Sequence, residues 1–432
     1  MKKILFLGGA PMQMAPIQYA RQQGHYVLTC DYLPENPGHK LAHEYHNVST
    51  TDMEAVLEVA RHARIDGIVP YASDPAAPTA AYVGNALGLP SNPYEAVLTL
   101  ARKDLFRRFL REHGFHVPRS ESFDGFPDAR DYAGTLRLPI FVKPVDSSGS
   151  KGVTQVHDLD DLETAFSHAL SYSRAKRVVV EERIVRKGYQ VAGDGFVVDG
   201  RLAFRCFANE HFDKLCNGLV PIGESFPAVH DSRLLDAAHR ETQRLLTLLG
   251  MRTGALNFDF VFTEAGEFFF LELGPRNGGN LIPEVIRYIT GVDLAKYTVD
   301  AALGLDCSRL KMEPPQEYYS SYIVHALHDG MCTGLRVTER LKPRLVELDI
   351  QVKPGDPVRQ FKGSNDTLGT AILRFESETE MLTMMDNMER DIRVRTTRPA
   401  RRVLQAKSSI SPAGSPAPVF RASDVDLSGA AT

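Results

Sequence analysis

The sequence predicts an α/β protein that begins with a Rossmann-like domain and ends with a smaller α+β module. Residues 1–95 alternate short apolar strand patterns with helical patterns, which is typical of a parallel sheet covered by helices. Residues 316–405 instead contain several strand patterns and one helix. Hydrophobic residues make up 43% of the 432 residues and charged residues 24%, an ordinary balance for a soluble chain of two to four domains.

Charge and cysteine content exclude several classes of protein. A net charge of −4 gives no basic surface for nucleic acid, and no apolar run is long enough to span a membrane. The apolar run at the N-terminus is only about five residues long, which favours a buried strand over a signal peptide. The five cysteines are scattered without a CxxC pair, so a zinc site is not expected. We expect a reduced, cytoplasmic protein with neither nucleic acid nor membrane among its partners.

The elements of the first domain alternate along the chain. They are expected in the order strand 2–9, helix 15–23, strand 25–31, helix 50–64 and strand 66–73. Thr51 or Asp52 is the expected N-cap of the second helix. The turn after the first strand contains Gly8 and Gly9 but lacks the third glycine of a dinucleotide fingerprint. A scaffold without nucleotide is therefore at least as well supported as an NAD site, and an NAD-dependent oxidoreductase is a poor alternative.

The middle and the end of the chain mix strands, helices and loops. The middle is expected to contain helix 103–113, strand 139–144, loop 145–153, helix 159–171, strand 177–185, a hairpin over 191–208, helix 232–249, a hairpin over 254–280 and two helices over 281–303. The first hairpin should turn at Asp199-Gly200, and the two helices should break at Gly291. The last module should contain strands 318–327, 344–352, 369–377 and 391–397 and helix 379–389. From about Lys407 the chain is rich in Ser, Pro, Ala and Gly, which predicts disorder.

The hairpin over 254–280 carries the most informative pattern. If its turn centres between Ala265 and Gly266, Asp259 and Glu272 lie directly opposite each other, roughly 5 Å apart. Two carboxylates that close repel unless a cation lies between them, and Mg²⁺ (or Mn²⁺) takes oxygen ligands together with substrate phosphates. Acidic residues on exposed hairpins are common, but Glu272 ends a buried-strand pattern, where an unpaired carboxylate is rare. Arg276 follows four residues later, beside a glycine run, as in a phosphoryl-transfer site.

The loop 146–153, DSSGSKGV, predicts a phosphate site directly after a strand. Its small residues let backbone N–H groups approach phosphate oxygens, and Lys143 and Lys151 add positive charge. The loop is not a Walker A motif, and alone it would more often be a plain turn. Lys103 lies on a helix, where lysines are usually solvated. The strand 178–185 begins with apolar residues and continues with Glu181 and Glu182. Its backbone could pair with the edge of an adenine, or the strand could simply leave the core and enter a charged loop.

Taken in order, these motifs resemble the ATP-grasp superfamily over residues 3–305. The first domain resembles the pre-ATP-grasp domain of carbamoyl-phosphate-synthetase-like and biotin-carboxylase-like members. Residues 355–377 resemble the closing domain of carboxylate–amine ligases of the L-amino-acid-ligase kind. The resemblance implies the following division: 1–95 a Rossmann-like pre-ATP-grasp domain, 96–185 the small ATP-grasp subdomain with a linker helix, 186–310 the large subdomain with the metal site, 316–405 the α+β domain, and 406–432 a disordered tail.

The resemblance also implies roles for individual residues, with ATP and Mg²⁺ or Mn²⁺ as cofactors. Lys103 and Lys143 would bind the phosphates. Asp259 and Glu272 would ligate the metal ions. Arg276 would stabilise the acyl phosphate or the tetrahedral intermediate, with Lys151 as a second catalytic cation. The remaining nucleotide contacts would come from the lid residues Ser147, Ser148, Gly149 and Gly152, and from Glu181, the Glu182 carbonyl, the Ile184 amide and Gln190 at the adenine and ribose.

Three positions depart from the superfamily pattern. Gly274 stands where an Asn usually follows the metal Glu, and we expect Asn257, opposite Gly274 in the hairpin, to supply the missing amide oxygen. Gln190 replaces a common Glu, and Asn280 stands where biotin carboxylases place a Glu base. The last departure argues against biotin carboxylation.

The resemblance implies a ligase that activates a small-molecule carboxylate as an acyl phosphate for attack by an amine, with ADP and phosphate as products. The alternatives are a carbamoyl-phosphate-synthetase-like enzyme that activates bicarbonate or carbamate, and a non-catalytic ATP-binding protein. The substrates are not readable: His211, Lys214 and Arg205 could contact a carboxylate, although a structural role is expected for each. We also expect a homodimer, as in similar proteins.

Overall fold

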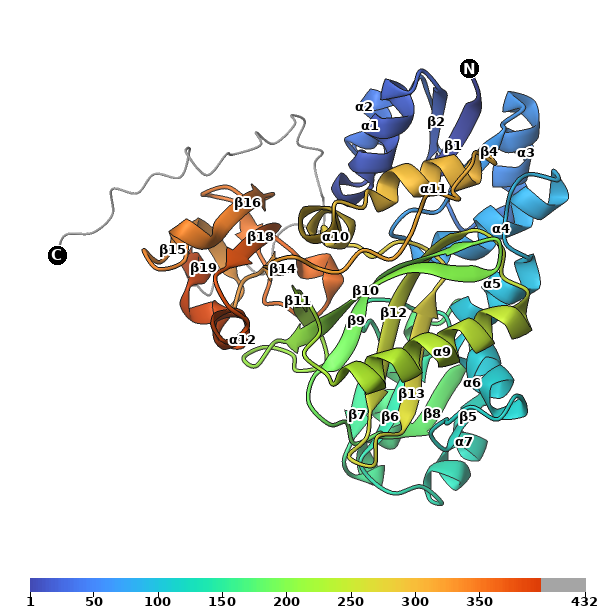
Figure 1. Ribbon diagram of the computed structural model, residues 1–432. Helices are drawn as coiled ribbons and strands as arrows, with labels where there is room; N and C mark the ends of the chain where they lie inside the picture. Colours follow the sequence, from blue (N-terminus) through green and yellow to red (C-terminus); the bar gives the residue numbers. More distant parts are fainter. Residues whose placement is uncertain (398–432) are drawn as a thin grey trace, which may run out of the picture. The chain divides into compact units, whose positions relative to one another are not determined.

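The computed structural model describes residues 1–397, which form two compact units (Figure 1). The first comprises Met1–Asn209 and Ala228–Pro314, and the second comprises Glu210–Pro227 and the described residues from Pro315. The predicted α/β and α+β fold class is confirmed. The five-part division stays a prediction, and the expected disordered tail, 406–432, lies outside the described residues.

The first unit opens with a parallel sheet of order β3-β2-β1-β4. Its strands are β1 Lys3–Leu7, β2 Tyr26–Cys30, β3 Glu44–His46 and β4 Gly67–Val69, and the accompanying helices are α1 Met14–Gln22, α2 Gly38–Leu41, α3 Met53–Ala63 and α4 Ala77–Ala86. Strands β1 and β2 are buried along nearly their whole length, as a sheet covered on both faces requires. The side chain of Asp52 accepts from the backbone N of Ala55, so Asp52 is the cap of α3.

The turn after β1 is occupied by the chain's own side chain. The Gln13 Nε2 donates to the carbonyls of Leu7 and Tyr71, and the backbone N of Ala10 donates to its Oε1. Gly8 adopts φ +117, and a Cβ there would lie 2.1 Å from the Gln13 side chain. Because Gln13 fills the space where a dinucleotide phosphate would approach, this turn favours the scaffold without a nucleotide.

The next part of the first unit is an antiparallel sheet of order β5-β8-β6-β7. Its strands are β5 Ser120–Phe123, β6 Ile140–Pro144, β7 Thr154–Val156 and β8 Val178–Glu182. Helices α7 Phe126–Ala133 and α8 Leu162–Tyr172 bury their apolar residues against this sheet in a separate core. Helices α5 Tyr94–Ala101 and α6 Lys103–Glu112 precede it and contact each other.

A second antiparallel sheet of the first unit holds the predicted hairpins. Its strands, in the order β13-β12-β9-β10, are β13 Phe268–Gly274, β12 Gly254–Phe262, β9 Gln190–Val198 and β10 Arg201–Phe212, whose last residues enter the second unit. Asp199 and Gly200 both adopt positive φ, as the predicted tight turn requires. Helix α9 Ser232–Leu249 shares an aromatic-rich core with this sheet. Helices α10 Ile282–Thr290 and α11 Leu294–Ala302 are separated at Gly291, as predicted.

Among its described residues, the second unit contains two groups of strands and one α-helix. The strands β11 Pro221–Phe226, β14 Tyr318–Val324, β18 Gly369–Phe375 and β16 Leu345–Ile350 are neighbours in that order. The other sheet contains β17 Pro357–Val358, β15 Gly330–Val337 and β19 Ile392–Thr397, and the helix is α12 Glu378–Met385. Strand β15 was not predicted, since its two glycines weaken the strand pattern.

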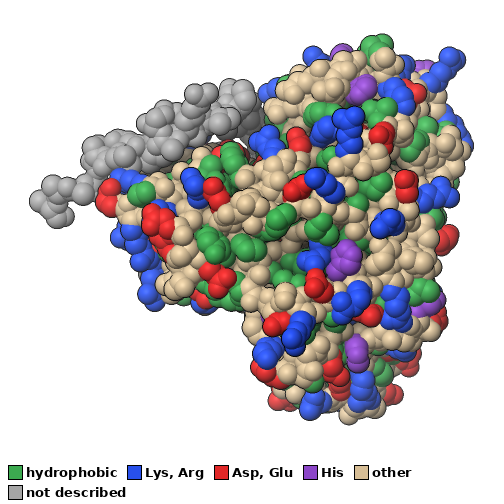
Figure 2. Space-filling model, viewed as in Figure 1, with side chains coloured by type: hydrophobic (Ala, Val, Ile, Leu, Met, Phe, Trp, Pro, Cys, Tyr) green, Lys and Arg blue, Asp and Glu red, His purple; other side chains and the backbone are tan. Residues whose placement is uncertain are grey.

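Acidic and basic side chains are interspersed over the face of the molecule shown in Figure 2. This mixture agrees with the small net charge of −4. Within residues 1–397, no helix is both long and apolar enough to cross a membrane.

Candidate active site

The two predicted metal carboxylates lie opposite each other on β12 and β13. Asp259 pairs with Glu272, and Asn257 pairs with Gly274, so the predicted register is confirmed at these positions. The turn itself is not where it was predicted. Phe262 pairs with Phe268, so the turn centres on Ala265 instead of between Ala265 and Gly266. An irregularity between Asp259 and Phe260 restores the register by leaving one extra residue on β13.

The charges around this pair are arranged to tolerate a cation. Burial, followed by the charge of Glu272, raises the pKa of Asp259 to about 7. Gln190 donates from Nε2 to Asp259 Oδ1 at 2.6 Å, and Lys103 Nζ lies 2.6 Å from Glu272 Oε1. Among the described residues, no three His, Cys, Asp or Glu side chains gather at one point. The two facing carboxylates supply oxygen ligands of the kind that Mg²⁺ binds, since this ion is held by one or two carboxylates and completes its shell with phosphates and water.

Asn257 has a different set of contacts from the one expected. Its Nδ2 donates to the Gly193 carbonyl at 3.1 Å and to Asp194 Oδ1 at 2.9 Å. Asp194 is fully buried and also accepts from the backbone N of Gly278. Burial raises the pKa of Asp194 to about 6, against the opposing effect of these hydrogen bonds. Asn257 thus helps Asp194 hold the glycine turn after Arg276, and its role as a metal ligand stays a prediction.

Arg276 is held by an acidic partner that the sequence did not reveal. Its Nε and Nη2 each lie 2.7 Å from an oxygen of Asp74, and its Nη1 donates to the Asn277 carbonyl. Burial works to raise the pKa of Asp74, but the Arg276 guanidinium outweighs it, so the pKa is lowered. Asp74 follows β4, and a polar residue beyond the carboxyl end of a parallel strand is the one signal that could have pointed to it.

Lys103 connects Glu272 to the predicted phosphate loop. Besides its contact with Glu272, its Nζ donates to the Ser147 carbonyl at 3.0 Å. The residues Lys103, Ser147, Ser148, Glu272 and Gly274 all line one cavity of about 290 Å³ in the first unit. The helix, the loop and the hairpin, which are far apart in sequence, therefore meet at one place.

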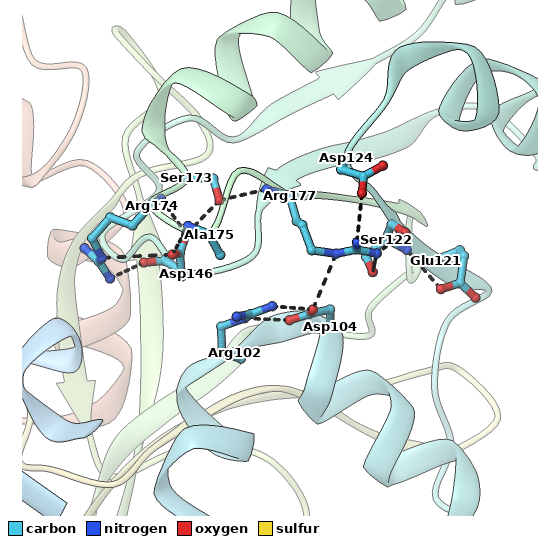
Figure 3. Close-up of polar contacts among 10 residues, drawn as sticks. All are labelled: Arg102, Asp104, Glu121, Ser122, Asp124, Asp146, Ser173, Arg174, Ala175 and Arg177. Carbon is cyan, nitrogen blue, oxygen red and sulfur yellow. Dashed lines mark hydrogen bonds and ion pairs between the residues drawn. The ribbon is translucent and has the colours of Figure 1, made fainter. Parts of the chain in front are cut away.

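The phosphate loop is anchored at its first residue (Figure 3). Asp146 accepts from the Ser173 hydroxyl at 2.9 Å and from the backbone N of Arg174 and Ala175. Within the loop, Gly149, Ser150 and Gly152 have positive φ. At Gly152 a Cβ would lie 2.9 Å from Tyr172 Cβ, so a side chain would displace the loop. The catalytic role predicted for Lys151 is untested and stays a prediction.

Glu181 carries a buried ion network. Its side chain is 4% exposed, with Oε2 3.0 Å from Arg107 Nε and Oε1 2.6 Å from Lys143 Nζ. Burial opposes ionisation, but Arg107 and then Lys143 outweigh it and lower the pKa of Glu181 to about 2. Arg107 also donates to the Leu271 carbonyl on β13. The carboxylate of Glu181 therefore holds Lys143 and ties α6 and β6 to β8.

The rest of the predicted hinge follows Glu181. Glu182 accepts from Arg119 and from the backbone N of Arg137, while Ile184 is half-buried in the following loop. Binding of adenine by Glu181, Glu182 and Ile184 stays a prediction, as does the ribose contact of Gln190.

The three candidate carboxylate contacts have structural partners. In the second unit, His211 lies 2.9 Å from Asp386 and 2.8 Å from the Ser225 hydroxyl. Lys214 donates to the Asp386 carbonyl. In the first unit, Arg205 contacts Asp236 and His239.

The chain is similar to several known proteins. The family model described as D-ala D-ala ligase C-terminus matches residues 120–203. The chain is 25% identical over 340 residues to the uncharacterized protein y4rH of Sinorhizobium fredii, covering 76% of this chain and 69% of that one. It is 29% identical over 184 residues to the formate-dependent phosphoribosylglycinamide formyltransferase of Rhodococcus jostii, covering 41% of this chain and 45% of that one. It is 24% identical over 284 residues to the N-terminal section of the carbamoyl phosphate synthase large chain of Methanopyrus kandleri, covering 64% of this chain and 45% of that one.

Solved structures share the fold. The L-amino acid ligase of Bacillus licheniformis superposes with a TM-score of 0.76 at 18% identity, covering 92% of this chain and 99% of that one. A second structure is the biotin carboxylase domain dimer of the 2-oxoglutarate carboxylase of Hydrogenobacter thermophilus, in complex with MgADP, ADP and bicarbonate. It superposes with a TM-score of 0.69 at 14% identity, and the match covers 91% of this chain and 91% of that one. The predicted resemblance is confirmed, and the chain has the ATP-grasp fold.

Proposed function

We propose that the protein is an ATP-dependent ligase that activates a small carboxylic acid as an acyl phosphate for attack by an amine, with ADP and phosphate as the other products. The observation that carries the proposal is the facing pair Asp259 and Glu272, joined through Lys103 to the loop of Ser147. A pair of facing carboxylates, joined through a lysine to a small-residue loop, provides the kinds of group that phosphoryl transfer requires.

The described side chains divide the work of such a reaction. Lys103 and Lys143 would neutralise phosphate oxygens, and the contact with Glu181 would orient Lys143. Arg276, held by Asp74, would stabilise negative charge on the acyl group. Mg²⁺, when bound by Asp259 and Glu272, would supply further positive charge to the phosphates.

Activation of bicarbonate is the second candidate function, because the similarity to a carbamoyl phosphate synthase covers 64% of this chain. In that case bicarbonate would stimulate turnover without an added acid. The small-molecule substrates, the homodimer and the dependence on Mg²⁺ all belong to the proposal.

The direct test is release of ADP and phosphate from ATP and Mg²⁺ across a panel of amino acids, other small carboxylates, amines and bicarbonate. Stimulation by an acid with an amine, lost in Glu272→Gln, is the expected result. Glu264→Gln is the matched control, because Glu264 lies on the same hairpin with its side chain 76% exposed. Stimulation by bicarbonate alone would favour the second candidate, and nucleotide binding without turnover for any panel member would contradict both enzymatic functions.

A further inference from the structure

Strand β13 contains a β-bulge directly before Glu272. Phe260 pairs with Phe270, and the next pair along the hairpin is Asp259 with Glu272. Leu271, between the two paired residues of β13, therefore has no opposite residue on β12. Such an extra residue interrupts the ladder and re-aims the side chains that follow it. The bulge thus decides which face of the sheet Glu272 occupies.

Without the bulge, Glu272 would lie on the wrong face of the sheet. A regular ladder would place Leu271 opposite Asp259. Glu272 would then lie opposite Phe258, which is 1% exposed and belongs to the core of this sheet. Opposite residues share a face, so Glu272 would point into the core and lose its facing carboxylate. The facing pair therefore depends on a change of register by one residue.

Arg107 of α6 binds the backbone carbonyl of the bulged residue. Its Nη1 donates to the Leu271 carbonyl at 3.0 Å and also lies 3.4 Å from the Phe270 carbonyl. In the described part of the chain, β13 is an edge strand, so carbonyls on its outer side have no neighbouring strand to donate to them. A backbone carbonyl shielded from water is unfavourable without a donor, and Arg107 supplies that donor at the bulge.

The same guanidinium is fixed from another side by Glu181. The side chain of Arg107 is 4% exposed, and its Nε lies 3.0 Å from Glu181 Oε2. The planar fork of an arginine holds two acceptors in a defined geometry, which a lysine ammonium cannot reproduce. One turn earlier on α6, Lys103 contacts the carboxylate of Glu272 itself. Helix α6 therefore contacts both the bulge and the carboxylate that follows it.

Resting on the proposed function, we propose that Arg107 is a positioning residue for the metal site. By holding the bulge at Leu271, it keeps Glu272 on the face of Asp259, where both carboxylates can reach one ion. It contacts neither the ion nor the substrates and acts through the backbone of β13. Because Glu181 holds Arg107 from β8, the metal carboxylates are also set relative to the strand of the predicted adenine hinge.

The test measures Mn²⁺ affinity by electron paramagnetic resonance, with and without a non-hydrolysable ATP analogue, so it does not depend on turnover. Arg107→Lys keeps a positive charge beside Glu181 but loses the arm that reaches Leu271. It should weaken Mn²⁺ binding by roughly 10–100-fold, as substitution of groups that orient metal ligands does. Arg111→Lys is the matched control and should bind Mn²⁺ as wild type does, because Arg111 lies one turn later on α6 with its side chain 47% exposed.

Deletion of Leu271 separates this role from a purely structural one. The shortened strand can form a regular ladder in which Glu272 still lies opposite Asp259. In this background Arg107→Lys should change the Mn²⁺ affinity by less than about threefold, because no bulge remains to be held. An equal loss of affinity from Arg107→Lys with and without Leu271 would overturn the inference.

Glu181→Gln decides the inference if the deletion variant does not fold. It removes the counter-charge of Arg107, but the glutamine oxygen still accepts from the guanidinium and the Leu271 carbonyl stays bound. The variant should unfold at lower urea and yet keep its Mn²⁺ affinity without nucleotide within about threefold of wild type. A loss of Mn²⁺ affinity as large as that of Arg107→Lys would show that lost stability alone is responsible and would overturn the inference.

The failures of the two proposals are distinguishable. Mn²⁺ binding that depends on Arg107, without stimulation of ADP release by any acid, would support the inference and contradict the ligase. Acid-stimulated turnover together with an Mn²⁺ affinity that Arg107→Lys leaves unchanged would overturn the inference alone. Wild-type protein that binds no Mn²⁺ under either condition would contradict both.

Discussion

Replacing Glu181 with Gln should destabilise the first unit by about 3 kcal/mol at pH 7. The two cations of the network lower the pKa of Glu181 from 4.5 to about 2, and each pKa unit corresponds to about 1.4 kcal/mol. The magnitude agrees with the roughly 3–5 kcal/mol lost when one partner of a buried ion pair is removed. The glutamine would leave Arg107 and Lys143 without a counter-charge at positions where Arg107 is 4% and Lys143 17% exposed.

The pH dependence of this difference has a defined sign. Because the pKa is lowered in the folded state, the stabilisation is present above pH 4.5 and is lost as the pH falls through about 2. The difference between wild type and Glu181→Gln should therefore shrink to roughly half near pH 3.

Urea denaturation followed by circular dichroism or tyrosine fluorescence measures the difference, since the chain has 15 tyrosines and no tryptophan. Glu182→Gln is the control, because its partner Arg119 is 56% exposed and such surface pairs contribute less than about 1 kcal/mol. A Glu181→Gln variant within about 0.5 kcal/mol of wild type, or a difference independent of pH, would refute the reasoning.

Three further results are expected. Asp259→Asn should reduce Mg²⁺-dependent ADP release by on the order of 100-fold, measured at saturating ATP, because it removes one of the two facing carboxylates. Burial and the charge of Glu272 raise the pKa of Asp259 to about 7, so protons compete with Mg²⁺ below that pH. The Mg²⁺ concentration for half-activation should then rise by up to about tenfold per pH unit, and a value independent of pH between 5.5 and 8 would contradict this. Asp146→Ala should weaken ATP binding by roughly tenfold in calorimetry, because it frees the start of the phosphate loop, whereas Asp124→Ala, 77% exposed, should not.

Local patterns predicted many of the helices and strands, although not β15, and they predicted the facing carboxylates. Helix α9 has the predicted limits. The pairing of Asp259 with Glu272 was also predicted, but it holds because an extra residue on β13 offsets a turn that lies half a residue earlier than predicted. The extra residue on β13 was not predictable, since nothing in the apolar run 268–271 marks one member as unpaired.

The partners of the site residues could not be predicted from local patterns. Arg276 and Asp74 are separated by 202 positions, and Arg107 and Glu181 by 74. The Glu181 motif predicted a hinge. Its side chain is buried because β6 pairs with β8 and Arg107 of α6 packs against it, which no local pattern indicates.

The central claim is the transfer of an oxygen atom from the acid to phosphate. With the accepted acid labelled with ¹⁸O in its carboxylate, attack on the γ-phosphate forms the acyl phosphate and breaks the bond to ADP. Displacement by the amine then breaks the carbon–oxygen bond, so one labelled oxygen leaves with phosphate. Mass spectrometry of the released phosphate should therefore show one ¹⁸O per turnover. Phosphate free of ¹⁸O, formed together with ADP, would show hydrolysis by water and contradict the account.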